Sequence, residues 1–260
     1  MSYTPAEMMT VAAARALDNR DVCFVGIGLP SAACNLARLT HAPRIQLIYE
    51  SGTLRTRPDV LPLSIGDGEL CETALTTVAV PEVFRYWLQG GRISIGFLGG
   101  AQVDRFGNLN STVIGNYAQP KVRLPGSGGA TEIATGAGQI FIVMRHGVRS
   151  FFTRLDFLTS LGHGRTGRER RELGIRTKGP TLLVTDLCIM RPDAETREMV
   201  VDSLHPGITR EQVRRNTGWE VRFADAVVET APPSPEELEV LRELHARTTR
   251  AHGGAAGGSE

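Results

Sequence analysis

The chain has 260 residues, of which 41% are hydrophobic and 22% are charged, and its formal net charge is +1. This length can bury one large core or two small ones. A charge so close to zero argues against a nucleic-acid-binding surface, which usually carries a strong basic excess. No apolar stretch reaches the roughly 20 residues that cross a bilayer, and MSYTPAEMM lacks the pattern of a secretory signal. We therefore expect a cytoplasmic protein that binds neither nucleic acid nor membrane.

Cysteines and histidines are scattered along the chain. Because no CxxC pair occurs, we expect reduced cysteines that fill core space, with neither a disulfide framework nor a metal site; they are Cys23, Cys34, Cys71 and Cys188. No two of the six histidines have the spacing of metal ligands on a helix.

The N-terminal region predicts a βαβ unit. Thr4-Pro5-Ala6-Glu7 has the capping-box pattern and predicts a first helix that runs to about Leu17. The apolar run 21–27 predicts a strand, residues 29–39 predict a helix, and residues 45–49 predict a second strand. A strand, a helix and a strand at this spacing form a crossover unit with parallel strands.

The remainder of the chain continues the α/β pattern. Further buried strands are expected at 92–98, 139–144, 181–185 and 198–203. Helices are expected at 81–88, from Thr209 with a second capping box, and from Ser234 to about Thr249, whereas 151–159 is ambiguous. No repeat or linker divides the chain, so residues 1–250 are predicted to form one α/β domain, and the low-complexity residues 251–260 a disordered tail.

The predicted strand 45–49 ends in Glu50, followed at once by Ser51-Gly52. A buried strand has no packing use for an ionisable side chain, and the small residues after it leave that side chain accessible. A solvated loop residue is the ordinary interpretation of such a glutamate. In open α/β sheets, however, ligands bind at the carboxyl ends of the strands, which favours a function for Glu50.

Three glycine-rich segments follow predicted strands or precede helices. Gly26-Ile27-Gly28 is a partial dinucleotide fingerprint without its third glycine, and it fits a tight turn as well as a ligand site. Gly99-Gly100, with the Asp104–Ser111 segment after it, fits hairpin chemistry. The loop Gly126-Ser127-Gly128-Gly129 can direct consecutive N–H groups at a phosphate or an oxyanion, or it can be a flexible surface loop.

Basic residues accompany these segments. Lys121 and Arg123 precede the last glycine loop and add positive charge there. Residues 163–178 contain six Arg or Lys against two Glu, which is typical of a solvated basic loop and less often of a partner for cofactor phosphates.

Several motifs occur in order along the chain: IYESG, LPLSIGDG, GFLGGAQVDRFGNLNST, PGSGGA and LHPGITREQV followed by TGW. Together they resemble the β subunits of class I CoA-transferases, in the glutaconate and 3-oxoadipate CoA-transferase branch. The resemblance covers about residues 4–250. It implies a three-layer α/β sandwich around a mostly parallel sheet, of the NagB/RpiA/CoA transferase-like type.

The resemblance implies that Glu50 is the nucleophile of an acyl-CoA:carboxylate CoA-transferase and passes through a glutamyl-CoA thioester. A carboxylate nucleophile forms an anhydride and so conserves the thioester energy. By the same resemblance, the amides of Gly128 and Gly129 are candidates to stabilise the oxyanion, with Gly126 in the same CoA-binding loop. Ser51 and Gly52 would give the substrate access.

The family further implies partners and substrates. Coenzyme A would be a substrate and a transient covalent adduct, with no tightly bound cofactor, and an α subunit would complete a heterotetramer. The favoured pair is succinyl-CoA and 3-oxoadipate in aromatic-compound breakdown; glutaconate with acetyl-CoA is the alternative. A CoA-ester hydrolase or decarboxylase and a non-catalytic acyl-CoA-binding subunit remain open, and Arg55 and Arg57 could bind a substrate carboxylate or lie on the surface.

Overall fold

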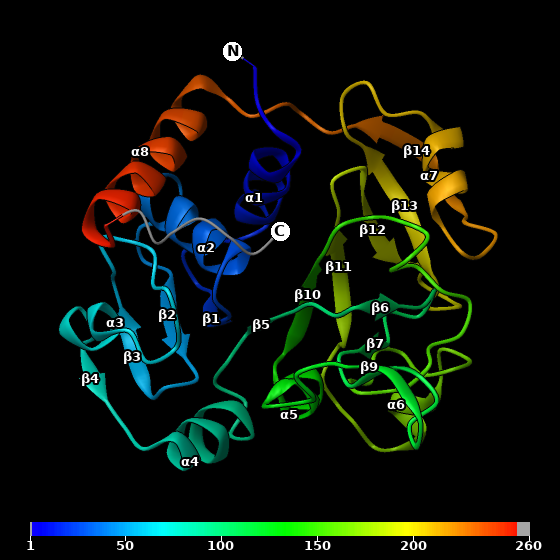
Figure 1. The fold of residues 1–260 in the computed structure, drawn as a ribbon, viewed down its shortest axis with the longest axis horizontal. Coiled ribbons are helices and arrows are strands. Elements are labelled where there is room, and N and C mark those ends of the chain that lie inside the picture. Colours follow the sequence, from blue (N-terminus) through cyan, green and yellow to red (C-terminus); the bar gives the residue numbers. More distant parts are fainter. Residues whose placement is uncertain (1, 254–260) are drawn as a thin grey trace.

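The computed structural model describes residues 2–253 and contains a sheet of ten strands (Figure 1). The strand order is β14-β13-β12-β11-β10-β5-β1-β2-β3-β4. Five central strands run parallel: β11 (Pro180–Val184), β10 (Gln139–Val143), β5 (Ile95–Leu98), β1 (Val22–Val25) and β2 (Gln46–Tyr49). The antiparallel pairings involve the strands that flank them, β12 (Cys188–Pro192), β13 (Met199–Leu204), β3 (Thr53–Thr56) and β4 (Thr76–Thr77), whereas β14 (Phe223–Glu229) is parallel to β13.

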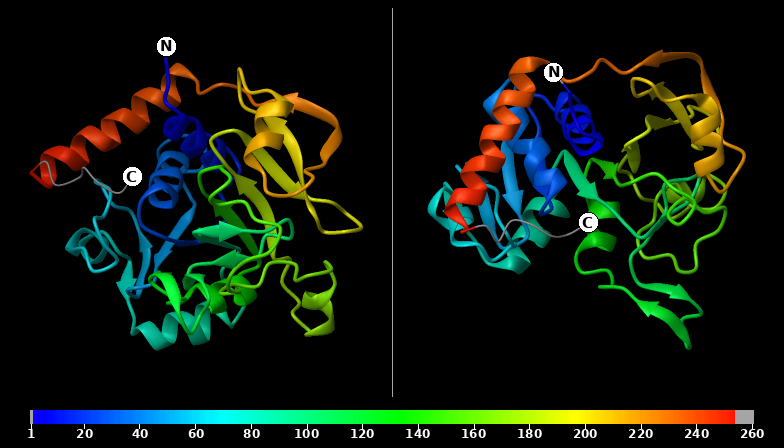
Figure 2. Two further views of the ribbon diagram at one scale, coloured as in Figure 1. Left: turned by 45° about the vertical axis from the view of Figure 1, so that its right-hand side comes forward. Right: turned by 45° about the horizontal axis from the view of Figure 1, so that its top comes forward.

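Successive residues of the central strands enter different cores, as the period of two in a strand requires. In β1, Cys23 and Val25 belong to one cluster and Phe24 to the other. The first cluster lies under α1 (Pro5–Arg15), α2 (Leu29–Leu39) and α8 (Pro235–Ala251), which contact one another (Figures 1 and 2). The second lies under α5 (Ala130–Gly136) and the π-helix η1 (Val83–Leu88). This arrangement confirms the predicted three-layer α/β architecture.

Short elements complete the chain. They are α3 (Gly68–Glu72), the hairpins β6 (Gln102–Val103) with β7 (Leu109–Asn110) and β8 (Val113–Gly115) with β9 (Pro120–Arg123), α6 (Glu169–Glu172) and α7 (Arg210–Asn216). Both predicted capping boxes are present, because Thr4 exchanges hydrogen bonds with Glu7 and Thr209 with Gln212. Among residues 2–253, no helix combines the length and apolar character that crossing a bilayer requires.

Some predictions need correction. The helix expected at 81–88 is a three-residue α4 (Val80–Glu82) followed by the π-helix. The segment 151–159, which the sequence left ambiguous, has no helix or strand and forms one isolated bridge, at Phe151. The last helix continues to Ala251, so the expected tail does not begin there, and residues 254–260 lie outside the described part. Three cysteines are buried as expected, but Cys71 is exposed, since it lies on the outer face of α3.

Candidate active site

Glu50 lies at the carboxyl edge of the central sheet, in the turn that joins β2 to β3. The N–H of Gly52 donates to the carbonyl of Tyr49 over 3.0 Å, so Glu50 and Ser51 are the two central residues of a β-turn. Tyr49 points into the core under α2, where its hydroxyl bonds with Ser31 at 2.6 Å and burial raises its pKa. The alternation along the strand therefore directs Glu50 to the opposite face, where η1 and α5 lie.

The Glu50 side chain is half-buried, and it has no hydrogen bond or ion pair to any group in the described residues. Carboxylates that are partly removed from water normally accept hydrogen bonds or pair with a cation. Other half-buried acids of this chain follow that rule, such as Glu237, whose carboxylate pairs with Arg15 at 2.6 Å and accepts a hydrogen bond from the N–H of Ser234 at the start of α8. The carboxylate of Glu50 is thus held at the edge of the sheet with its acceptor sites free.

The glycine loop before α5 reaches this carboxylate. A Cβ atom built on Gly129 would lie 2.5 Å from Oε1 of Glu50 and 2.6 Å from Cζ of Phe84. Only a residue without a side chain allows these three groups to meet, since real Cβ atoms do not approach other atoms so closely. Glu50 and Gly129, which are 79 positions apart in the sequence, therefore lie against each other, and their expected catalytic roles stay a prediction.

Phe84 is a site residue that the sequence did not reveal. It belongs to the π-helix η1, and its ring packs edge-on against Phe24 of β1, with the centroids 5.7 Å apart. The ring forms an apolar wall beside Glu50. Single-turn π-helices are frequent at functional sites, but the motif VFRYWL carries no signal that distinguishes a π-helix from an α-helix.

The members of the glycine loop differ in what their N–H groups do. The N–H of Gly126 donates to the carbonyl of Ser111 over 2.9 Å, and its carbonyl accepts from the Ser111 hydroxyl. Gly126 therefore anchors the loop, in a left-handed conformation with φ of +95°. The N–H groups of Gly128 and Gly129, by contrast, have no acceptor among the described residues. These two donors remain available at the place where the loop meets Glu50.

Ser51 and Gly52 have distinct environments. The hydroxyl of Ser51 is buried without a hydrogen-bond partner in the described residues, which is costly for a polar group unless a ligand supplies one. Gly52 has φ of +100°, and a Cβ there would overlap the carbonyl oxygen of Val78, which lies against the turn. The glycine at 52 is thus needed for chain packing, whereas the expected role in substrate access stays a prediction.

The glycines that end β1 and β5 lie at the same edge. Gly26–Gly28 follow β1, the neighbour of β2, and Gly99-Gly100 follow β5, the next strand beyond β1, at spacings of about 4.8 Å per strand. Gly28 starts α2 with φ of +82°, and nothing lies within 4 Å of the position of its missing Cβ. The tight turn expected between β1 and α2 is therefore present at Gly28, and the described residues leave open the side toward which a Cβ would point.

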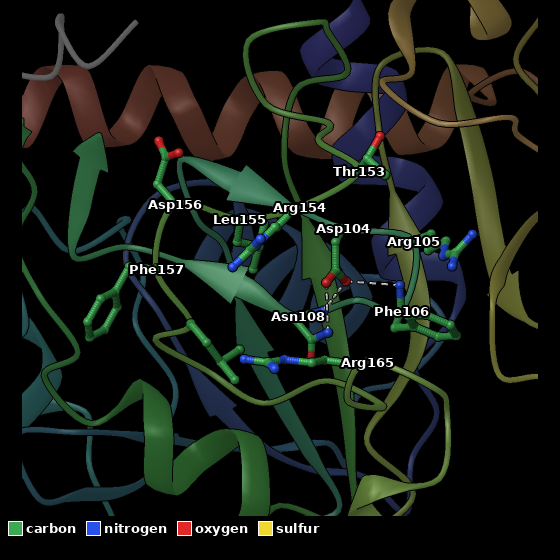
Figure 3. Close-up of a pocket in the computed structure, with 11 residues that line it drawn as sticks. Asp104, Arg105, Phe106, Asn108, Thr153, Arg154, Leu155, Asp156, Phe157 and Arg165 are labelled. Atoms are coloured by element: carbon green, nitrogen blue, oxygen red, sulfur yellow. Dashed lines mark hydrogen bonds between the residues drawn. The ribbon is translucent and has the colours of Figure 1, made fainter. Parts of the chain in front are cut away.

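The segment after Gly100 follows the expected hairpin chemistry. Asp104 accepts hydrogen bonds from the backbone N–H groups of Phe106 and Asn108, and from the Asn108 side chain at 2.8 Å (Figure 3). Burial raises the pKa of this carboxyl. A cavity of about 550 Å³ opens beside the turn, with Arg154 and Arg165 among its lining residues, but Glu50 does not line it.

The predicted basic residues lie elsewhere. Arg57 comes directly after Thr56, which pairs with Leu47 near the start of β2. Its guanidinium donates to the carbonyl of Pro43. The length of β2, about 13 Å, separates it from Glu50. Arg55 is exposed where the β2–β3 register shifts, and Arg123 stacks on Tyr117 at 4.5 Å. This arrangement favours the surface role for Arg55 and Arg57.

The stretch 163–178 is not the uniformly solvated loop that its composition indicated. His163 and Arg170 are buried, at 3% and 5% exposure. His163 contacts the carbonyl of Pro180 at 2.8 Å, and Arg170 donates to backbone carbonyls and to the Thr177 hydroxyl. Local composition could not predict this burial, because it does not show which backbone carbonyls the folded chain brings against these two side chains. No group of three or more potential metal ligands occurs in the described residues.

Comparison with known proteins identifies the family. A family model described as coenzyme A transferase matches residues 6–216. The chain belongs to the coenzyme A transferase family. It is 62% identical over 256 residues to the β subunit of 3-oxoadipate CoA-transferase of Pseudomonas knackmussii, an alignment that covers 98% of each chain. It is 38% identical to the β subunit of glutaconate CoA-transferase of Acidaminococcus fermentans, over 93% of this chain and 92% of that one.

A solved structure supports the same assignment. Glutaconate coenzyme A-transferase from Acidaminococcus fermentans matches with a TM-score of 0.87 and 35% identity, over 93% of this chain and 94% of that chain. The resemblance inferred from the motifs and the fold expected from it are therefore confirmed. The chain is a CoA-transferase subunit of the β type.

Proposed function

We propose that this chain is the catalytic β subunit of an acyl-CoA:carboxylate CoA-transferase, with Glu50 as its nucleophile. One observation supports this role above the others: the Glu50 carboxylate has no internal partner in the described residues, and it lies against the backbone of Gly129. A nucleophile needs an unshared oxygen and a donor near the developing negative charge, and this arrangement offers both.

The proposed reaction consists of reversible acyl-transfer steps. A carboxylate oxygen of Glu50 attacks the thioester carbon, the carbon–sulfur bond breaks, and a mixed anhydride and the CoA thiolate result. The thiolate then attacks the glutamyl carbonyl, which releases the first acid and leaves a glutamyl-CoA thioester. An incoming carboxylate reverses these two steps and leaves as the new acyl-CoA, so no water and no external oxidant enter the balance.

The groups around Glu50 fit these steps. Each attack creates a tetrahedral oxyanion, and the free N–H groups of Gly128 and Gly129 are the donors available to it. The unpartnered hydroxyl of Ser51 is a further donor or acceptor beside the reacting carbonyl. The ring of Phe84 covers one side of Glu50 and limits the approach of water to the anhydride.

The similarity to the Pseudomonas enzyme supports 3-oxoadipate as the acceptor acid, with succinyl-CoA as the donor. The relative that acts on glutaconate supports that acid as the alternative. Both are dicarboxylates, so the site requires a cation or donor for the second carboxylate. Since Arg55 and Arg57 lie away from Glu50, we expect the partner subunit to supply it.

We place the chain in a heterotetramer of two α and two β subunits. Both relatives are named as one subunit of their enzyme, and a closed symmetric assembly is the simplest arrangement of two chain types. We also infer a cytoplasmic location, because three of the four cysteines are buried as free thiols.

The test is transfer by the complex of this chain with its α subunit. Succinyl-CoA and 3-oxoadipate should yield 3-oxoadipyl-CoA and succinate, with slower turnover on glutaconate. Succinyl-CoA consumption should require the acceptor acid. Consumption that proceeds equally without an acceptor would support the hydrolase or decarboxylase alternative, and full turnover by Glu50→Ala would support a non-catalytic binding subunit.

A further inference from the structure

A second charged cavity lies in the region of α6. It has a volume of about 330 Å³, and among the described residues no acidic side chain lines it. Five cationic side chains do: Arg170, Arg171, Arg176, Lys178 and Arg197. His163 also lines the cavity, but burial lowers its pKa to about 4, so it is neutral at pH 7.

The cavity lies at the amino edge of the sheet, the edge opposite to Glu50. The N–H of Lys178 donates to the carbonyl of Gly138, directly before β10 begins. Thr181, at the start of β11, lines the cavity as well. Because β10, β11 and β2 run in the same direction, the carboxyl end of β2 faces away from this edge. The steps proposed at the Glu50 carboxylate therefore do not use these charges.

Two segments that are distant in sequence close around the cavity. A Cβ on Gly167 would overlap the carbonyl oxygen of Thr196 and lie 3.2 Å from Cβ of Arg197. The glycine thus lets the loop before α6 pack on the turn between β12 and β13. This contact brings Arg197 to the charges contributed by residues 170–178.

Positive charge in this cavity has no counter-charge in the described part of the chain. None of the five cations has a carboxylate oxygen within 4.0 Å. Arg170 is the most constrained, at 5% exposure: it donates to the carbonyls of Leu161, Gly162 and Ala134 and to the Thr177 hydroxyl, all uncharged. Its Nε is buried without a partner. Burial without an anion lowers the pKa of Arg170 to about 10.

Such an arrangement is unfavourable without a ligand. Buried charges in proteins are normally paired, because the loss of hydration is otherwise uncompensated. Four further cations around the mouth repel one another and focus a positive potential into the cavity. An anion with several oxygens would relieve both effects, since arginine forks match phosphate geometry and the flexible lysine adds a point charge.

We propose that this cavity binds a phosphate-bearing small molecule. Arg171, Arg176, Lys178 and Arg197 contact the phosphate oxygens, and the buried charge of Arg170 stabilises the anion from beneath. A phosphate group can come from the nucleotide end of coenzyme A or from a free phosphorylated metabolite, and both present the same chemistry to the cavity.

The test measures binding by calorimetry, with the complex of both subunits and with inorganic pyrophosphate as the probe. The double variant Arg176→Ser/Arg197→Asn removes two exposed cations; asparagine is chosen because residue 197 has φ of +62°. We expect at least a tenfold rise in Kd. The control Arg20→Ser removes an equally charged, exposed side chain that does not line the cavity and should leave Kd unchanged.

Two further titrations separate the sources of the phosphate. If coenzyme A occupies the cavity, adenosine 3′,5′-bisphosphate competes with acyl-CoA, and the double variant raises the KM for acyl-CoA. If a free metabolite occupies it, pyrophosphate still binds when acyl-CoA is saturating, and the KM stays constant. Absence of pyrophosphate binding to the wild type, or equal Kd in the double variant, would overturn the proposal. Because binding is measured without turnover, this result is independent of the role of Glu50.

Discussion

Two carboxylates in turns beside the central sheet, Glu50 and Asp104, have opposite environments. The carboxylate of Asp104 accepts hydrogen bonds from two backbone N–H groups and from the side-chain amide of Asn108. Glu50 lies against Gly129 and Phe84 and has no donor in the described residues. Both residues follow strands and precede glycines, so residue type and position alone do not separate them. The comparison shows that a carboxylate without a hydrogen-bond partner indicates a reactive site better than the mere presence of an acidic residue in a turn.

The largest expected effect comes from Glu50→Gln. The amide has nearly the same shape but is a poor nucleophile, so the transfer rate should fall at least about 1,000-fold. Because Glu50 has no internal partner in the described residues, the free energy of unfolding should change by less than about 0.5 kcal/mol. Steady-state kinetics and urea unfolding of the same preparation measure both. A large loss of stability would show that Glu50 is structural, as Asp104 is.

Gly129→Ala tests the contact between the loop and Glu50. The new methyl group would lie 2.5 Å from Oε1 of Glu50 and 2.6 Å from Cζ of Phe84, so these side chains would have to move. A displacement of about 1 Å near reacting groups can cost roughly 100-fold in rate. Gly147→Ala is the control, since Gly147, like Gly129, has no positive φ but faces open space in the described part of the chain; it should change stability by less than about 1 kcal/mol and leave the activity unchanged. Equal activity of the two variants would contradict the proposed geometry.

Buried His163 should make the free energy of unfolding depend on pH. Its pKa is lowered to about 4 by burial, whereas an unfolded histidine titrates near 6.5. The unfolded chain therefore binds more protons between pH 6.5 and 4, and His163 alone should lower the stability by about 3 kcal/mol as the pH falls through this window; partly buried His146, with its pKa also lowered to about 4, acts in the same direction. Urea unfolding at several pH values tests this, and His163→Gln should flatten the slope. An unchanged slope in the variant would assign the acid sensitivity to other groups.

Asp104→Ala should show the smallest effect on activity. Removing the carboxylate leaves three donors without an acceptor, which costs about 1–3 kcal/mol of stability. The transfer rate per folded molecule should stay within twofold, because the turn does not contact Glu50. Activity loss comparable to that of Glu50→Gln would remove the distinction between the two carboxylates.

Much of the fold could be predicted from the sequence because its central strands are buried on both faces. Such strands are continuous apolar runs, as in QIFIV and TLLV, and local capping boxes mark helix starts. The edge strand β14 was missed because its residues are mostly exposed and alternate weakly. The π-helix was missed because its hydrogen-bond pattern depends on packing under β1, which the local sequence does not record.

The candidate site was predictable only in part. Glu50 can be recognised from the local sequence, because it ends an apolar strand and is followed by the small residues Ser51 and Gly52. Phe84 and the different roles of Gly126 and Gly129 depend on contacts across 15 to 79 residues, which no periodicity reports. The packing of Gly52 against Val78 was also not evident from the sequence, and the expected role of Gly52 in substrate access stays a prediction. Long-range packing therefore accounts for the contacts that the sequence did not indicate.

The most direct measurement is the mass of the peptide that contains Glu50, isolated after the complex has been incubated with succinyl-CoA alone and quenched in acid. Our account predicts that this peptide gains the mass of coenzyme A less one water, that addition of an acceptor acid removes the gain, and that Glu50→Gln never shows it. An unmodified peptide in an actively transferring complex, or an adduct on another residue, would contradict the central claim.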